Sequence, residues 1–205
     1  MTFAKRPGWS TRLVPDAVVQ RHSRSRVLLT FDDGPHPVHT PAVLAKLREY
    51  DLKAVFFLVG NRVARAPHVV KQIVEAGHTI GNHTYSHTRW PMLAGQRIWR
   101  DIAKCQQVVT DAAGVCPTVF RPPFGRLTPG ILVAAWSQRM RVMNWSLDSG
   151  DWQCRSDVDA EKCATEVVEL VQPGDIVLFH DDHEYAARIL DRVLLEIVST
   201  NLFRR

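Results

Sequence analysis

An apolar run that ends in two carboxylates stands near the start of the chain: Val27-Leu28-Leu29-Thr30-Phe31, followed by Asp32-Asp33-Gly34-Pro35. A short apolar run closed by Gly-Pro is typical of a buried strand that ends in a turn. Adjacent aspartates are common in ordinary turns and helix caps. Neighbouring side chains also point in different directions, so one carboxylate can bind a metal ion while the other accepts a proton. Both interpretations stay open until the rest of the chain is considered.

The chain beyond this run alternates predicted strands with predicted helices. Further apolar runs predict strands at 54–58, 78–81, 119–121, 141–145 and 176–179. Apolar spacings of three and four predict helices that begin at Thr40 and Pro67, and others over 98–109, 128–139, 159–171 and 186–199. Thr40 is expected to cap its helix, with Pro41 in the first turn. Strands alternating with helices predict an α/β protein with a mostly parallel sheet covered by helices.

Length and composition fit one globular domain. The 205 residues are 45% hydrophobic and 23% charged, which excludes a disordered or collagen-like chain. Lys and Arg number 26 against 21 Asp and Glu, a net charge of +5, and the densest basic stretch is 21–26. We expect residues 1–26 to form a solvated extension and 27–205 to form the domain. Interleaved aromatics and a reading helix, which a nucleic-acid-binding arm would need, are absent, so no nucleic-acid partner is expected.

The sequence contains no membrane-spanning segment and no cysteine motif. The richest apolar run, 54–59, has six residues, whereas a spanning helix needs ~18. The N-terminus has no apolar stretch long enough for a secretion signal, so the sequence as given predicts a cytoplasmic protein, or an exported one if a leader was removed. The four cysteines include no C-x-x-C pair and are assigned no chemistry. The oligomeric state is left open.

Polar residues collect directly after the predicted strands. Five clusters do so: Asp32–Pro35, Asn82–His87, Arg121–Gly125, Asp148–Trp152 and His180–Asp182. In a parallel barrel or an open α/β sheet, the carboxyl ends of the strands meet on one face, where sites are built. The clusters are therefore expected to lie together, and this convergence is the strongest signal in the sequence.

The second cluster contains a histidine pair suited to a metal ion. His83 and His87 are four residues apart, so a helical turn or a tight loop brings both rings to the same side. Two imidazoles, one carboxylate and water make an open site for one divalent metal ion, most simply zinc, with cobalt or nickel as alternatives. Such an ion acidifies water, a second carboxylate accepts the proton, and a separate acid such as His180 protonates the leaving group.

Five stretches around these clusters, 30–35, 83–87, 121–125, 148–152 and 178–181, resemble the five motifs of the NodB-like polysaccharide deacetylases (carbohydrate esterase family four). The resemblance covers 27–201, in the family's order and spacing, and all five motifs together are very specific. It implies a distorted, incomplete (β/α) barrel with parallel strands. It also implies a metal-dependent hydrolase that removes acetyl groups from N-acetylated sugars, with 27–205 as its catalytic domain.

The resemblance also implies a role for individual residues on the metal side of the site. Asp32 would be the general base, and Arg121 would hold it through a charge-assisted pair. Asp33, His83 and His87 would bind the metal ion.

On the acid side, the resemblance makes His180 the general acid and Asp151 the residue that orients it. Trp152 and Leu178 would form the walls around the acetyl methyl group. The backbone N–H of Phe124 would help to hold the oxyanion. Tyrosine often stands at this position in the family, but only the backbone is needed there.

Two neighbouring features are given no catalytic role. Asp148 is expected to shape its loop, and Asp182-His183-Glu184 is expected to be a loop after the last strand rather than a second metal site.

The leading functional hypothesis is a deacetylase that releases acetate from N-acetylglucosamine-containing glycans, such as chitooligosaccharide or peptidoglycan. An acetyl-xylan esterase would use the same machinery and is the alternative. A catalytically silent glycan-binding protein would require the loss of a residue such as Asp32 or His180, and both are present.

Overall fold

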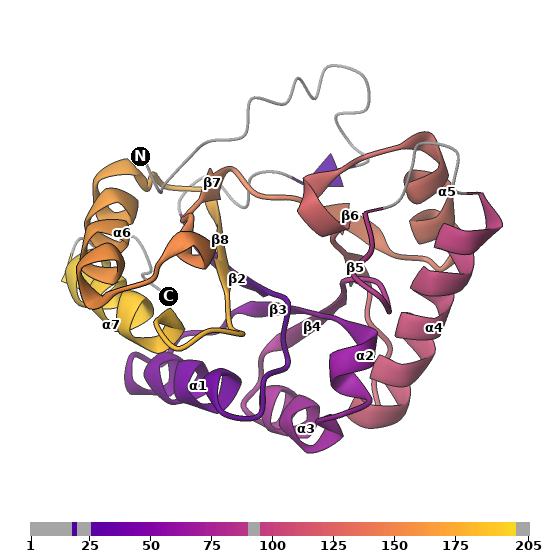
Figure 1. Ribbon diagram of the computed structural model, residues 1–205, viewed down its shortest axis with the longest axis horizontal. Helices are drawn as coiled ribbons and strands as arrows, with labels where there is room; N and C mark the ends of the chain where they lie inside the picture. The colour runs from indigo at the N-terminus through magenta and orange to yellow at the C-terminus, as the bar shows by residue number, and fades with distance from the viewer. Residues whose placement is uncertain (1–17, 20–25, 90–94, 200–205) are drawn as a thin grey trace.

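The chain folds into a curled parallel sheet with helices on its outside (Figure 1). The computed structural model describes residues 18–19, 26–89 and 95–199. Within this part the strand order is β1-β6-β5-β4-β3-β2-β8-β7, and every neighbouring pair is parallel. Because β1 and β7 form two separate edges, the sheet is an incomplete barrel, as expected from the sequence.

The strands are short. They are β1 (Val18–Val19), β2 (Leu28–Asp32), β3 (Val55–Leu58), β4 (Thr79–Asn82), β5 (Val119–Phe120), β6 (Arg141–Met143), β7 (Leu147–Asp148) and β8 (Ile176–His180). The α-helices are α1 (His39–Glu49), α2 (Gly60–Val63), α3 (Pro67–Glu75), α4 (Gln96–Ala113), α5 (Pro129–Ser137), α6 (Asp157–Leu170) and α7 (Ala186–Ser199). Two 3₁₀ turns, η2 (Pro123–Gly125) and η3 (Asp151–Gln153), follow β5 and β7.

The core is built on β2 and its two neighbours. Phe31 of β2 stacks on Phe56 of β3 and on Phe179 of β8, with ring centroids 4.9 and 5.8 Å apart. In register, Asp32 pairs with His180 and Asn82 with Phe120, so these strands end side by side. The polar residues that follow them are thereby brought to one end of the sheet.

Most predicted elements are present, with one clear error at Thr40. The structure begins α1 at His39 and gives it no side-chain cap. The Thr40 hydroxyl instead donates a hydrogen bond to the buried carboxylate of Asp181, and this partner lies 141 residues away in sequence. By contrast, Thr128 caps α5 as its sequence suggests, since its hydroxyl accepts from the Ile131 N–H at 3.2 Å.

The predicted extension contains one described strand. Val18–Val19 pairs with β6, so this part of 1–26 belongs to the sheet. The basic stretch at 21–25 lies outside the described residues. The division of the chain at residue 27 stays a prediction.

None of the helices in the described ranges has the length and apolar character required to cross a bilayer. All four cysteines are free, and three of them, Cys105, Cys154 and Cys163, are buried.

Candidate active site

A pocket of about 440 Å³ opens at the carboxyl ends of the strands. Its lining is Asp32, Asp33, His83, His87, Phe124, Trp145, Asp148, Trp152, Leu178 and His180. Eight of these ten are residues singled out from the sequence. The remaining two predicted residues, Arg121 and Asp151, are fully buried and contact pocket residues from behind. The structure therefore brings the whole predicted set together.

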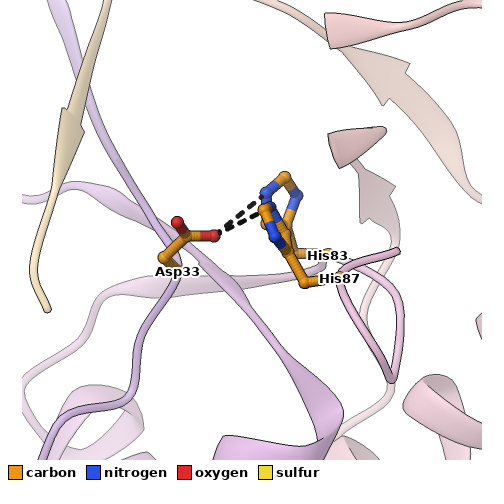
Figure 2. A group of neighbouring side chains, drawn as sticks. All are labelled: Asp33, His83 and His87. Carbon is orange, nitrogen blue, oxygen red and sulfur yellow. Dashed lines mark ion pairs between the residues drawn. The ribbon is translucent and has the colours of Figure 1, made fainter. Parts of the chain in front are cut away.

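Asp33, His83 and His87 form a compact group of potential metal ligands (Figure 2). Asp33 Oδ1 lies 3.0 Å from His87 Nε2 and 3.5 Å from His83 Nε2. One ligand atom from each residue falls within 4.8 Å of the others. The histidines lie in a tight loop after β4 rather than on a helix, and His87 adopts a φ of 51°.

The surroundings of His83 prepare it as a ligand. Its Nδ1 lies 2.7 Å from the carbonyl oxygen of Arg121, which accepts the Nδ1 proton and leaves the Nε2 lone pair facing Asp33. Burial lowers the pKa of His83 to about 3, so its ring is neutral near pH 7. A backbone carbonyl that accepts from the far nitrogen is one of the usual ways to fix the tautomer of a ligating histidine.

The chemistry of this group fits a divalent cation. Asp33 Oδ1 is buried and has no hydrogen-bond partner, although two imidazole nitrogens lie within 3.5 Å. Close lone pairs without a shared proton repel one another unless a cation lies between them. The site gathers four carboxylates against two cations: Asp32, Asp33, Asp148 and Asp151 against Arg121 and His180. When all are ionised, four negative charges against two positive charges leave a surplus of two, which one dication would balance.

Asp32 is held beside this group by a buried ion pair. Arg121 Nη1 donates to Asp32 Oδ1 at 2.7 Å and also to the hydroxyl of Thr30 at 2.8 Å. The other guanidinium nitrogens donate to the carbonyl oxygens of Met143 and Asn144, both at 3.0 Å. Burial raises the pKa of Asp32, and the Arg121 charge opposes that effect. Because every guanidinium nitrogen of Arg121 donates a hydrogen bond, the position of Asp32 Oδ1 is fixed, and Asp32 Oδ2 faces the site.

His180 and Asp151 form a second ion pair on the other side of the pocket. His180 Nδ1 lies 2.7 Å from Asp151 Oδ1, and the His180 backbone N–H donates to Asp151 Oδ2, also at 2.7 Å. Burial alone would lower the pKa of His180, but the carboxylates, Asp151 foremost, outweigh it and raise the pKa to about 10. His180 is thus a cation near pH 7, and its Nδ1–H donates a hydrogen bond to Asp151.

Phe124, Trp152 and Leu178 supply the walls. Phe124 and Trp152 expose about half of their surface, 52% and 53%, whereas Leu178 is buried. Phe124 has a φ of 59°, a backbone conformation that is uncommon for a residue with a side chain. Its ring packs on that of His87, with centroids 4.8 Å apart.

Two wall residues and one contact were not predicted from the sequence. Trp145 lines the pocket, and its ring lies where a Cβ at residue 125 would come within 2.7 Å of it. Asp148 shapes its loop, as expected, by accepting the Gly150 N–H at 2.9 Å, but it also lines the pocket, and burial raises its pKa to about 6. His183 contacts Asp151 from the loop after β8. Its place three residues after His180 was the available signal.

Comparison with known proteins agrees with this geometry. The family model described as polysaccharide deacetylase matches residues 20–143. A peptidoglycan-N-acetylglucosamine deacetylase of Bacillus cereus is 36% identical over 78% of this chain, which spans 57% of that relative, a little over half its length. A chitooligosaccharide deacetylase of Azorhizobium caulinodans is 34% identical over 78% of the chain and 75% of its own length.

A solved structure extends the agreement to the fold. A peptidoglycan N-acetylglucosamine deacetylase, crystallised with a substituted N-oxidanyl-benzamide, superimposes with a TM-score of 0.82 at 31% identity. The match covers 94% of this chain and 92% of that structure. The chain belongs to the polysaccharide deacetylase family.

Proposed function

We propose that this protein is a metal-dependent deacetylase that hydrolyses the N-acetyl groups of N-acetylglucosamine-containing glycans and releases acetate. The observation that carries the proposal is the placement, around one pocket, of a metal-ligand group, a base held by an arginine and an acid held by a carboxylate. The names of the relatives support N-acetylglucosamine glycans as the substrate class.

Asp33, His83 and His87 would hold one divalent ion, and zinc is proposed because two imidazoles and one carboxylate suit it. Cobalt and nickel accept the same donors. When bound, such an ion supplies Lewis-acid polarisation of a carbonyl and lowers the pKa of a water ligand to ~7.

Asp32 is proposed as the general base. Its Oδ1 is occupied by Arg121, so Oδ2, which lies 3.7 Å from His83 Nε2, is the oxygen that would accept the proton of the attacking water. The raised pKa of Asp32 increases its affinity for that proton. Attack on the acetyl carbonyl carbon then forms the new C–O bond of acetate.

His180 is proposed as the general acid. Its Nδ1 proton is held by Asp151, so the proton at Nε2 is the one given to the sugar nitrogen as the C–N bond breaks. The products are acetate and a free amine. A cation bound by Asp33 would lower the pKa of His180 from about 10 and so make it a better acid.

The walls are proposed to select the acetyl group. Leu178 and Trp152 would enclose the methyl, and the Phe124 N–H would donate to the carbonyl oxygen as negative charge develops there. The exposed aromatic face of Trp152 leaves room for a sugar ring to approach.

Acetate release from a substrate panel tests the proposal. Chitooligosaccharide, peptidoglycan and acetyl-xylan would each be incubated with the zinc-loaded protein, with and without a chelator. We expect acetate from one or both N-acetylated glycans, lost with chelator and restored by zinc. Release from acetyl-xylan alone would favour an esterase, and no release from any of the three would overturn the proposal.

A further inference from the structure

His183 contacts the acid pair from a loop that lies between β8 and α7. Its Nε2 is 3.3 Å from Asp151 Oδ2, the oxygen that also accepts the His180 backbone N–H. The contact joins residues 32 positions apart in sequence. The imidazole is about one-fifth exposed, and Asp151 is fully buried. Asp151 therefore lies between two histidine rings.

The hydrogen bonding identifies which proton His183 carries. Its Nδ1 is buried and has no hydrogen-bond partner. A proton on Nδ1 would be a buried donor without an acceptor, which is costly, whereas a bare Nδ1 lone pair costs less. The tautomer protonated at Nε2 is thus favoured over the tautomer protonated at Nδ1, and Nε2–H donates to Asp151.

Asp151 then accepts four hydrogen bonds, two on each oxygen. Oδ1 receives His180 Nδ1–H at 2.7 Å and the Trp152 N–H at 2.9 Å. Oδ2 receives the His180 N–H at 2.7 Å and His183 Nε2–H at 3.3 Å. Among the described residues, His183 is the one side chain besides His180 that hydrogen-bonds to this carboxylate. It fixes the carboxylate plane and takes up part of its negative charge.

We propose that His183 is a positioning residue for the general acid. By donating to Asp151 Oδ2, it holds in place the carboxylate that orients His180. The same hydrogen bond weakens the stabilisation of protonated His180 by that carboxylate. The proposal rests on the proposed function, because it concerns the acid of that reaction. His183 itself is a member of neither the metal-ligand group nor the pocket lining.

The direction of the effect follows from the charges around the pair. The titratable groups that act on it are the carboxyls of Asp32, Asp33 and Asp148 and the thiols of Cys154 and Cys163. None of these donates to Asp151 Oδ2. Without the His183 donor, Asp151 would hold the His180 proton more tightly, so His180 would be a weaker acid and would lose its proton at higher pH.

Two substitutions separate the hydrogen bond from the packing. His183→Phe keeps a ring against Tyr185, whose centroid lies 6.5 Å from that of His183, but removes the donor. His183→Gln keeps an N–H donor at a similar reach. His183→Met is a second variant without a donor, for use if the phenylalanine variant does not fold. His68→Phe, at an exposed histidine on α3, is the matched control.

The readout is the pH dependence of kcat and kcat/KM for acetate release by the zinc-loaded protein. Loss of the outer hydrogen-bond partner of a metal ligand costs ~10–100-fold in affinity or activity, and on the same scale we expect the donor-free variants to lose about tenfold in kcat. The alkaline limb of kcat/KM, which reports deprotonation of the acid, should move to higher pH. His183→Gln should restore most of the rate and the wild-type limb, and His68→Phe should change neither.

A wild-type pH profile in a folded donor-free variant would overturn the inference. Equal losses in the Gln and Phe variants with an unmoved limb would do the same, since they would indicate packing alone. If the wild-type protein releases no acetate, the proposed function fails. The inference is then judged by NMR titration of the His180 imidazole, which should lose its proton at higher pH in His183→Phe than in wild type.

Discussion

Asp32 and Asp33 are adjacent in sequence, and their environments differ because the backbone turns between them. Asp32 is the last residue of β2 and is almost fully buried against Arg121. Asp33 adopts a φ of 72° and turns its carboxylate toward His83 and His87. The backbone turn between the two residues thus directs the Asp32 carboxylate to the Arg121 guanidinium and the Asp33 carboxylate to the two histidines.

Replacing Asp32 by asparagine should separate catalysis from metal binding. The amide oxygen still accepts from Arg121, and the metal-ligand group is untouched, so metal content should equal that of the wild type. The amide cannot take a proton, so kcat should fall by ~10²–10⁴. Kinetics with elemental analysis of the same sample checks both parts. His87→Ala is the contrasting variant and should lose the ion. Near-normal turnover in Asp32→Asn would remove Asp32 as the base.

At the scale of elements, the loop after β8, which follows the general acid His180, also contacts the residues that position the metal ligand Asp33. The fully buried Asp181 accepts the Thr40 hydroxyl of α1, and Asp182 pairs with Arg62 of α2 at 2.6 Å. Arg62 also donates to the carbonyl oxygen of Asp33. Gly34 leaves the space that Asp181 needs, because a Cβ there would lie 2.4 Å from its carboxylate. The turn that bears the metal ligand is thus set by residues from three elements.

Asp181 should make folding stability depend on pH. Burial, with help from Asp182 and Asp33, raises its pKa from 3.8 to about 7 against the opposing Thr40 hydrogen bond. Between those two values the folded protein binds more protons than the unfolded chain, so this group's contribution to stability is present below pH 4 and is lost as the pH rises through 7.

The substitution Asp181→Asn tests this. The amide does not titrate, so the stability of the variant relative to wild type, measured as the difference in their free energies of unfolding, should be greater at pH 8 than at pH 5. Urea unfolding of both proteins at both pH values, in the same metal state, measures it. His180 loses its contribution between pH 6.5 and about 10 in both proteins, so it cancels in the comparison. A difference that is the same at the two pH values would contradict the assignment.

Strongly periodic elements were predictable from sequence, and elements that depend on distant partners were not. α7 has the predicted bounds, and the Ile98–Val109 spacing lies within α4 as expected. The four-residue α2 and the two-residue β1 and β7 are too short to carry a period. Thr40 was misassigned because its partner, Asp181, is adjacent only in the fold.

The features of the site also divide into those that were predictable from sequence and those that were not. Its convergence was predictable because each polar cluster follows a strand, and parallel strands end on one face. The spacing from His180 places His183 near the acid, but it could not reveal that His183 reaches back to Asp151, nor that Trp145 lines the pocket. Those contacts depend on how the loops after β6, β7 and β8 fold over one another.

At the scale of the whole molecule, the core and the site are physically separate. One cluster of buried apolar side chains joins β2, β3 and β8 to α1, α6 and α7, and a second joins β5 and β6 to α4 and α5. Neither contains a residue of the metal-ligand group. The fold therefore has no need of the ion to bury its apolar surface, unlike a small domain whose metal replaces a core.

Removing the ion should abolish activity and leave the fold intact but less stable. A ligand that binds only the folded state stabilises it by ~2.7 kcal/mol when present at 100 times its Kd. For a chain of this length, 1 kcal/mol moves Tm by ~2–4 °C, so zinc at that excess should raise Tm by about 5–10 °C over the chelated protein. Far-UV circular dichroism below the transition should be the same in both forms. Calorimetry with acetate assays on the same samples tests this, and His83→Ala should show neither the Tm rise nor the activity. Loss of secondary structure on chelation would show that the fold depends on the ion. A Tm that does not change on chelation would show that Asp33, His83 and His87 do not bind the ion.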